Sequence, residues 1–139
     1  MFSAALQESI RALVFLAAAQ PETYVRGEAI ARSIDRPFFF LTKNLTRLSH
    51  GGLLQTKRGA NGGVRLARPA SEITLMQVAS ALGEQALFDA CVLGAGRCNT
   101  DRPCAIHPEW GGIKARLIAM MNQTTLAQIA PDFSLSAEL

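Results

Sequence analysis

The sequence predicts a mainly α-helical fold of the winged helix-turn-helix type, with a two-stranded β-wing and a long helix near the C-terminus. Three observations predict it. Apolar residues recur at helical spacing over residues 3–19 and again over residues 37–50. Two short runs with strand character flank the turn-rich segment GANGG at residues 59–63. A further helical pattern begins at Pro108 and continues to about residue 127.

Bulk composition limits the class of protein. The chain has 139 residues, which fits one compact domain, or a small domain with an appendage used for assembly. Only 18% of the residues are charged and 49% are apolar, which favours an oligomer that hides apolar surface. No run of eighteen apolar residues occurs, so no membrane span is expected. Free thiols without an export signal favour the cytoplasm.

Three helices are expected before the wing. The first covers residues 3–19 until Pro21 ends the run, and its apolar positions are Leu6, Ile10, Leu13, Val14, Ala17 and Ala18. A short second helix is expected at residues 28–33. The third begins at Pro37 and stops at Gly51 and Gly52, with an apolar stripe of Phe38, Leu41, Leu45 and Leu48.

The second half of the chain continues with a hairpin around GANGG and then a fourth helix, which begins at Thr74 and ends at Gly83. Thr74 and Gln77 stand at capping-box spacing. Residues 84–107 are expected to form a loop, and Pro108 opens the long helix. Residues 130–139 lack periodicity and are expected to fray.

Charge is distributed unevenly along the chain. Residues 1–68 contain ten Lys and Arg against four Asp and Glu, whereas residues 69–139 contain four against seven. Between Arg36 and Arg68 there are seven basic residues and no acid. This segment therefore favours contact with a polyanion.

The basic segment holds the residues expected to bind double-stranded DNA. Only a helix or a two-stranded ribbon fits the major groove, so the third helix is expected to enter it. The predicted DNA-binding residues are Phe39, Thr42, Lys43, Arg47 and His50 of this helix and Lys57 and Arg58 of the wing. Thr42 and Lys43 would contact base edges, Phe39 a thymine methyl and Arg58 a minor groove. A basic helix face can also be merely solvated, but its adjacency to a basic wing favours DNA.

All three cysteines and one histidine lie in one polar segment. Cys91, Cys98, Cys104 and His107 have the spacing C-x6-C-x5-C-x2-H. Inert thiols would need apolar surroundings, and this segment instead carries glycine, arginine, asparagine and proline. Three thiolates and an imidazole would suit zinc, although no close cysteine pair is present. An iron-sulfur cluster is larger than one ion, so it suits the wider spacing. His107 could instead act as a helix N-cap or pack against Trp110.

Several of these segments together resemble the Rrf2 family of bacterial transcription regulators: RALVFLA, LTRLSHGGLL, RGANGGVRLARP, ITLMQVASALG and the triple-cysteine loop. The resemblance covers roughly residues 2–128. The family includes iron-sulfur cluster regulators, nitric-oxide-sensing repressors and cysteine-metabolism regulators that lack a cluster. It implies a homodimer clasped through the long C-terminal helix, which binds a pseudo-palindromic operator. The implied division is a DNA-binding winged helix-turn-helix domain at 1–83, a cluster-binding loop at 84–107, and a dimerisation helix and tail at 108–139.

The segment CAIH, with Cys104 and His107, resembles the iron-sulfur regulator branch, which implies a 2Fe-2S cluster with three Cys ligands and one His ligand. A 4Fe-4S cluster is the alternative. In some relatives an acid on the first helix of the partner subunit is the fourth ligand. That position holds Gln7 here, which favours His107, and Glu8 of the partner subunit is the other candidate.

The sequence therefore predicts a DNA-binding regulator that senses redox state, nitric oxide or iron-sulfur supply through a bound cluster. The rival hypothesis is a cluster-carrying or zinc-binding protein without regulated DNA binding. An enzyme is not expected, because no paired carboxylates and no nucleophile motif occur.

Overall fold

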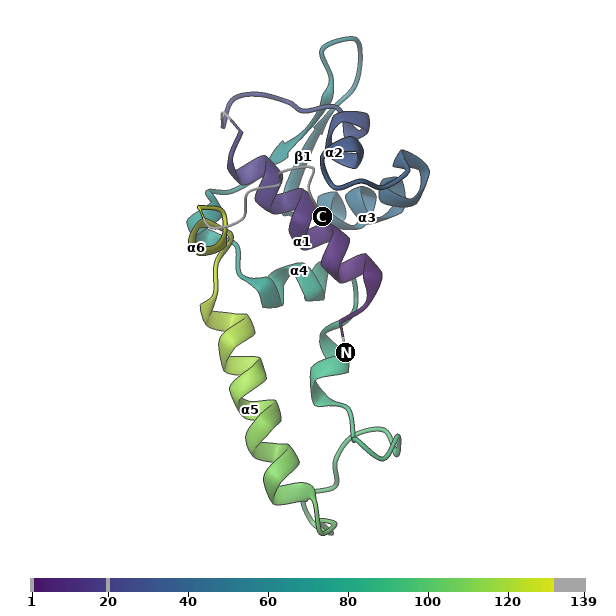
Figure 1. Ribbon diagram of the computed structural model, residues 1–139, viewed down its shortest axis with the longest axis vertical. Helices are drawn as coiled ribbons and strands as arrows, with labels where there is room; N and C mark the ends of the chain where they lie inside the picture. The colour runs from purple at the N-terminus through teal and green to yellow at the C-terminus, as the bar shows by residue number, and fades with distance from the viewer. Residues whose placement is uncertain (1, 20, 132–139) are drawn as a thin grey trace.

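The computed structural model describes residues 2–19 and 21–131, and it has the predicted mainly helical architecture (Figure 1). The elements in chain order are α1 (Ala4–Ala17), α2 (Gly27–Ser33), α3 (Phe38–His50), β1 (Leu54–Lys57), β2 (Gly63–Leu66), the 3-10 helix η1 (Ala70–Glu72), α4 (Leu75–Ala81), the 3-10 helix η2 (Gln85–Asp89), α5 (His107–Gln123) and α6 (Leu126–Ile129). Strands β1 and β2 pair antiparallel, with Leu54 opposite Leu66. The predicted wing is thus confirmed.

Side-chain caps stabilise the starts of helices α1 and α4. The Ser3 hydroxyl accepts a hydrogen bond from the Leu6 backbone N–H at 3.0 Å and begins α1. At α4, Thr74 and Gln77 exchange both hydrogen bonds of a capping box, as predicted. These caps satisfy backbone N–H groups that have no partner within the helix.

The core lies where α1, α3 and α4 meet the root of the wing. Leu6, Leu13, Leu41 and Leu48 are each fully buried. Phe38 was expected to belong to this stripe, but its side chain is 37% exposed and lies against Gly27 at the start of α2. The fully buried part of the apolar stripe of α3 therefore begins at Leu41.

A core substitution gives the first testable prediction. Leu13→Ala is expected to lower the free energy of unfolding by about 2–5 kcal/mol, because the cavity left in a fully buried site cannot collapse completely. Urea denaturation at fixed protein concentration measures this. Phe40→Ala is the matched control, since Phe40 is 64% exposed and its loss should change stability by about 0.5 kcal/mol or less. Equal losses in the two variants would contradict the assignment of the core.

The long helix ends earlier than residue 127. Helix α5 stops at Gln123, and the chain then becomes extended and pairs with the segment before α4. The Leu75 N–H donates to Thr124 O, and the Leu126 N–H donates to Ile73 O. Leu126, which takes part in this pairing, is fully buried. The predicted frayed tail lies mostly outside the described residues, from 132 onward.

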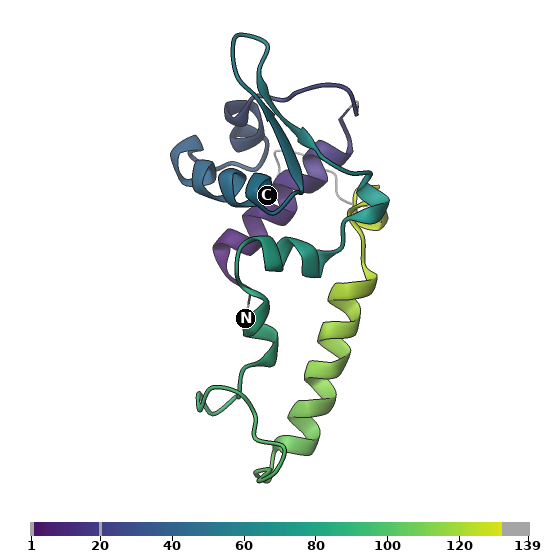
Figure 2. The ribbon, with the colours of Figure 1, turned by 180° about the vertical axis from the view of Figure 1, so that it is seen from behind.

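The molecule is elongated, with its two candidate sites at opposite ends. The wing projects at one end, and the loop that joins η2 to α5 lies at the other (Figures 1 and 2). Helix α5 runs away from the body, and of its residues only Lys114 and Met121 are buried. Ile113 and Met120 on this helix are 50% and 45% exposed. None of the helices in residues 2–19 and 21–131 has the length and apolar character needed to cross a membrane.

Candidate nucleic-acid interface and thiol loop

The outward face of α3 presents the predicted DNA-binding side chains to solvent. Phe39 is 83% exposed, and Thr42, Lys43 and His50 are also exposed. The Thr42 hydroxyl donates to Phe38 O at 2.9 Å, which leaves its oxygen lone pairs able to accept a hydrogen bond from a base. The N-terminal half of α3 therefore offers an aromatic ring that can contact a thymine methyl, a hydrogen-bond acceptor and a cation. These are the group types that read base edges.

Arg47 has a different orientation from the other predicted residues of α3. Its Nη1 lies 3.5 Å from Leu82 O, at the end of α4. The guanidinium is exposed but turned toward the body of the protein. Of the predicted set, Arg47 is thus held next to α4, at the C-terminal end of the recognition face.

The wing and α3 are separated by a groove of about 230 Å³. Thr42 and Thr46 line it from the helix, and Thr56 and Lys57 line it from β1. Lys57 also lines this groove, but its ammonium lies 5.6 Å from the centre of the Tyr24 ring, on the face of the wing that carries Arg65. Arg58 follows Lys57 in the exposed turn at the wing tip.

The wing is braced by the loop before α2, which sequence reasoning missed. Val25 and Val64 exchange two backbone hydrogen bonds of 2.8 Å. The Tyr24 ring lies 4.5 Å from the Arg65 guanidinium and 5.6 Å from Lys57 Nζ, so it bridges both strands by cation–π contacts. Arg26 Nη1 donates to Ala60 O at 2.8 Å and ties down the wing tip. Arg26 is thus an additional cation at the wing end of the molecule.

The first part of the thiol loop is a tight turn. The Cys91 N–H donates to Gly96 O at 2.7 Å, and Ala90 pairs with Arg97. Gly94 and Gly96 have φ angles of 73° and 79°, which favour glycine. The turn returns the chain so that Cys98 comes near enough to Cys91 to help lower the pKa of its thiol.

The environment of Cys91 favours its thiolate. A hydrogen bond from the Leu93 N–H lowers the pKa of the Cys91 thiol, with smaller contributions from Ala95, Cys98 and the charge of Lys114. Desolvation acts in the opposite direction and is outweighed. Thiolate is the form that binds metals and reacts with electrophiles.

This environment predicts the reactivity of the metal-free protein. At a pH below the ordinary thiol pKa, a lowered pKa leaves a larger thiolate fraction, so Cys91 should be alkylated by iodoacetamide with a rate midpoint at lower pH than that of N-acetylcysteine. Peptide mapping of the alkylated protein across pH measures this. A midpoint at or above that of N-acetylcysteine would contradict it.

The other two predicted ligands lie at the start of α5. The His107 N–H donates to Cys104 O at 3.0 Å, so the pair shares one turn. The N-cap of α5 is Ile106, and the N-cap interpretation of His107 is therefore wrong. Within the described ranges, no three His, Cys, Asp or Glu side chains gather closely enough to hold a metal ion. The four predicted ligands form two pairs, Cys91 with Cys98 and Cys104 with His107.

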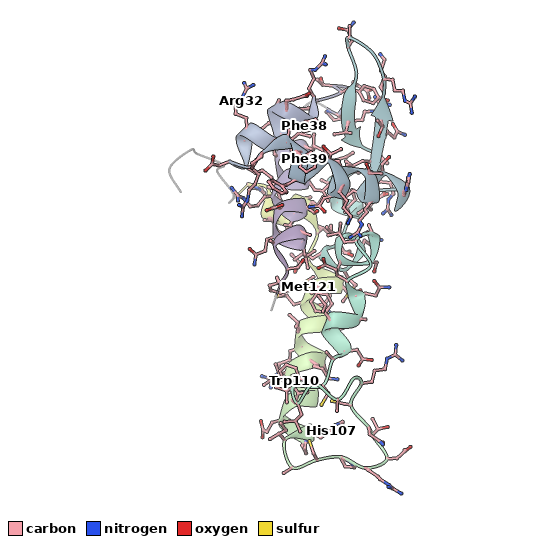
Figure 3. The ribbon with its side chains drawn as sticks, turned by 90° about the vertical axis from the view of Figure 1, so that its right-hand side faces the viewer. Arg32, Phe38, Phe39, His107, Trp110 and Met121 are labelled. Carbon is pink, nitrogen blue, oxygen red and sulfur yellow. The ribbon has the colours of Figure 1, made fainter. Side chains whose placement is uncertain are left out.

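The base of the loop is pinned to α5 by two side chains that sequence reasoning did not single out for this role. Trp110 Nε1 donates to Ala90 O at 3.0 Å. Lys114 Nζ donates to Asp89 O at 3.3 Å and lies 3.4 Å from the Asp89 carboxylate, which also pairs with Arg97. Figure 3 shows His107 and Trp110 together at this end of the molecule, far from Phe38 and Phe39. These contacts join the base of the loop directly to α5.

Glu8, the other candidate for a fourth ligand, has a partner within its own chain. Its carboxylate lies 2.9 Å from Arg36 Nε, and its side chain is only 13% exposed. Arg36 precedes α3, so this ion pair joins α1 to the turn that sets the position of the recognition helix. Use of Glu8 by another subunit would require breaking this pair.

Comparison with known proteins identifies relatives over the whole fold. Residues 2–132 match the Rrf2 family, described as "Iron-dependent Transcriptional regulator". A protein of Aquifex aeolicus (strain VF5), described as a candidate HTH-type transcriptional regulator, is 28% identical over 93% of this chain and 90% of its own length. The HTH-type transcriptional regulator IscR of Klebsiella pneumoniae (strain 342) is 32% identical over 65% of this chain and 55% of its own.

A solved structure supports the fold. CymR, the global cysteine regulator of B. subtilis, superposes with a TM-score of 0.82 at 21% identity and covers 96% of this chain and 98% of its own. These relatives are regulators and not enzymes, as the sequence predicted. The chain belongs to the Rrf2 family of transcriptional regulators.

Proposed function

We propose that the protein is a homodimeric, cytoplasmic regulator that binds a DNA operator and senses redox state, nitric oxide or iron-sulfur supply through an iron-sulfur cluster. The observation that carries the proposal is the combination of a basic reading head, with no acid between Arg36 and Arg68, and a loop that holds every thiol of the chain. The proposed division of labour is DNA binding by 1–83, cluster binding by 84–107 and dimerisation by 108–139.

DNA binding is supported by the geometry of the wing end. Thr42 of α3 and Thr56 of the wing line one groove, and Phe39 and Lys43 are exposed on the N-terminal half of α3. The braced hairpin adds Arg58 at its tip. A helix beside a basic ribbon matches a major groove with its neighbouring backbone and minor groove. Neutralised phosphates would supply most of the affinity.

The chemistry of the donor set fits an iron-sulfur cluster. The proposed ligands are Cys91, Cys98, Cys104 and His107, with 2Fe-2S favoured over 4Fe-4S. Free thiols that are exposed or half-exposed can be reached by iron and sulfide, and the loop carries glycines that allow it to wrap around a group larger than one ion. When bound, such a cluster supplies a centre that changes with oxidation, nitrosylation or loss of iron.

Dimerisation through α5 is supported by its exposed apolar side chains. Ile113 and Met120 are about half exposed, and Leu117 is only partly buried. Apolar residues left outside the core on a helix that leaves the body are typical of a subunit interface. Two-fold pairing through this helix would present two reading heads to the two halves of an operator.

A contact route joins the loop to the reading head. The Phe88 ring of η2 lies 6.0 Å from that of Phe2, and the Ser3 hydroxyl donates to Glu84 at 2.6–2.8 Å. Both contacts hold the start of α1, whose Glu8 pairs with Arg36 before α3. We propose that rearrangement of the loop shifts the population of recognition-helix positions through these contacts.

The test is an anaerobic purification followed by a footprint on genomic operator fragments with and without cluster. Visible absorbance with matching iron and sulfide content, and DNA affinity that falls steeply with salt, are expected. A colourless protein with stoichiometric zinc would overturn the sensor and favour the zinc-binding alternative. A DNA affinity that hardly changes with salt concentration would overturn DNA binding and favour a cluster carrier.

A further inference from the structure

A pocket of about 390 Å³ lies at the root of the wing, apart from both sites described above. Its apolar wall comes from Leu16 and Ala17 at the end of α1, Pro21, and Ala70. Arg65 and Arg68 add two guanidinium groups. The volume lies within the range of small-molecule sites, and a mostly apolar lining with a few polar groups is typical of them.

This pocket lies on the opposite face of the wing from the groove beside α3. Gln55 pairs with Arg65 across the ribbon, and both line the pocket. Thr56 pairs with Val64, and both line the groove. Successive side chains of a strand point to opposite faces, so the two hollows are separated by the ribbon itself. Helix α3 contributes no residue to the pocket lining.

The two guanidinium groups of the pocket differ in their partners. Arg65 is held by Gln55 at 2.9 Å, by the Tyr24 ring and by Glu22 at 3.4 Å. Arg68 is half-buried, and among residues 2–19 and 21–131 its guanidinium has no hydrogen-bond or ion-pair partner. The Glu22 carboxylate is 93% exposed and therefore neutralises little of the positive charge.

We propose that this pocket binds a small aliphatic carboxylate. Arg68 holds the carboxylate through its planar pair of donors, and the wall formed by Leu16, Ala17 and Pro21 holds the hydrocarbon chain. A guanidinium alone would accept any anion, but an apolar wall adds affinity only for a ligand with an apolar body. The site is independent of the thiols, because it lies at the wing end of the molecule.

Calorimetric titration of the full-length protein with hexanoate tests the site. Hexanoate is expected to bind saturably. We expect at least ~10-fold weaker binding of 1-hexanol, which lacks the charge, and of inorganic phosphate, which lacks the hydrocarbon chain. This factor corresponds to about 1.4 kcal/mol for either part of the contact. Arg68→Gln should weaken hexanoate by a similar factor. Arg58→Gln, on the same wing but outside the pocket, should leave hexanoate binding unchanged.

Several results would overturn the proposal. The first is binding that does not saturate. The second is an affinity for hexanol or for phosphate that equals the affinity for hexanoate. The third is an Arg68→Gln variant that has an unchanged melting temperature and still binds hexanoate normally. A lower salt slope of DNA binding in Arg68→Gln without hexanoate would show that Arg68 contacts a DNA phosphate instead. The titration needs neither cluster nor operator, so its outcome is separate from that of the proposed function.

Discussion

Cys98→Ser is expected to remove the visible absorbance of the anaerobically purified protein and to reduce its iron and sulfide content to background. Serine keeps the shape of the side chain but replaces a soft thiolate with a hydroxyl that stays protonated near neutral pH, so one ligand of the proposed cluster is lost. Cys98 also lies near Cys91, so the variant replaces one thiol of the pair that the turn around Gly94 and Gly96 brings together. Operator affinity should then differ at least ~10-fold from that of the loaded protein, within the usual range of coupling between sites.

The matched control for this experiment is Arg102→Gln, which changes an exposed residue of the same loop without touching a thiol. It should keep iron, colour and DNA affinity. Substitution of His107 by cysteine separates the two candidates for the fourth ligand, because a cluster retained with a changed spectrum would identify this position as a ligand. Full iron content in Cys98→Ser, or identical operator affinity with and without the cluster, would contradict the sensor.

Gly63→Val is expected to lower operator affinity at least ~30-fold, because it should detach the wing from the loop that braces it. Gly63 has a φ of 147°, a conformation that side-chain-bearing residues rarely adopt. A Cβ there would overlap the Val25 carbonyl and the Arg26 nitrogen. The substitution therefore breaks the Val25 pairing with Val64 and shifts the wing, including Lys57 opposite Gly63, relative to α3. The loss of two or three phosphate contacts accounts for the expected size.

Gly52→Ala is the control for backbone strain alone. Gly52 has a φ of 76° at the end of α3, but a Cβ there meets nothing within 4 Å. Its cost should be about 1 kcal/mol of stability with little change in DNA affinity or in its salt slope. Gel shift at several salt concentrations compares the two variants. If Gly63→Val and Gly52→Ala behave alike, the brace does not position the wing.

Local signals in the sequence were sufficient to predict the wing and helices α1 to α5, but not the short helices η1, η2 and α6. The GANGG turn predicted the hairpin, and Thr74 with Gln77 predicted the start of α4, because both signals act within a few residues. The early end of α5 was missed because it depends on pairing between Thr124 and Leu75, which are far apart in the chain. No local sequence pattern indicates such a contact.

The candidate sites were predictable to different degrees. Residue type and spacing were enough to propose the thiol set, but not to show that Cys104 and His107 share a turn of their own. The contribution of Tyr24 and Arg26 to the wing could not be foreseen, since both lie before the acid-free stretch and meet the wing only after folding. The contact of Arg47 with Leu82 at the end of α4 could not be predicted either, because the two residues are far apart in the sequence.

The elongated shape has a consequence for how a signal would be read by the operator. The thiol loop and the wing occupy the two extremities of the long axis, with the helical body between them (Figure 2). In the proposed dimer, each protomer would act as a lever, in which a slight tilt near the thiols becomes a larger displacement of the wing tip. A pair of such levers would sense the helical phase between two half-sites, so the length of the DNA spacer would decide which operators respond.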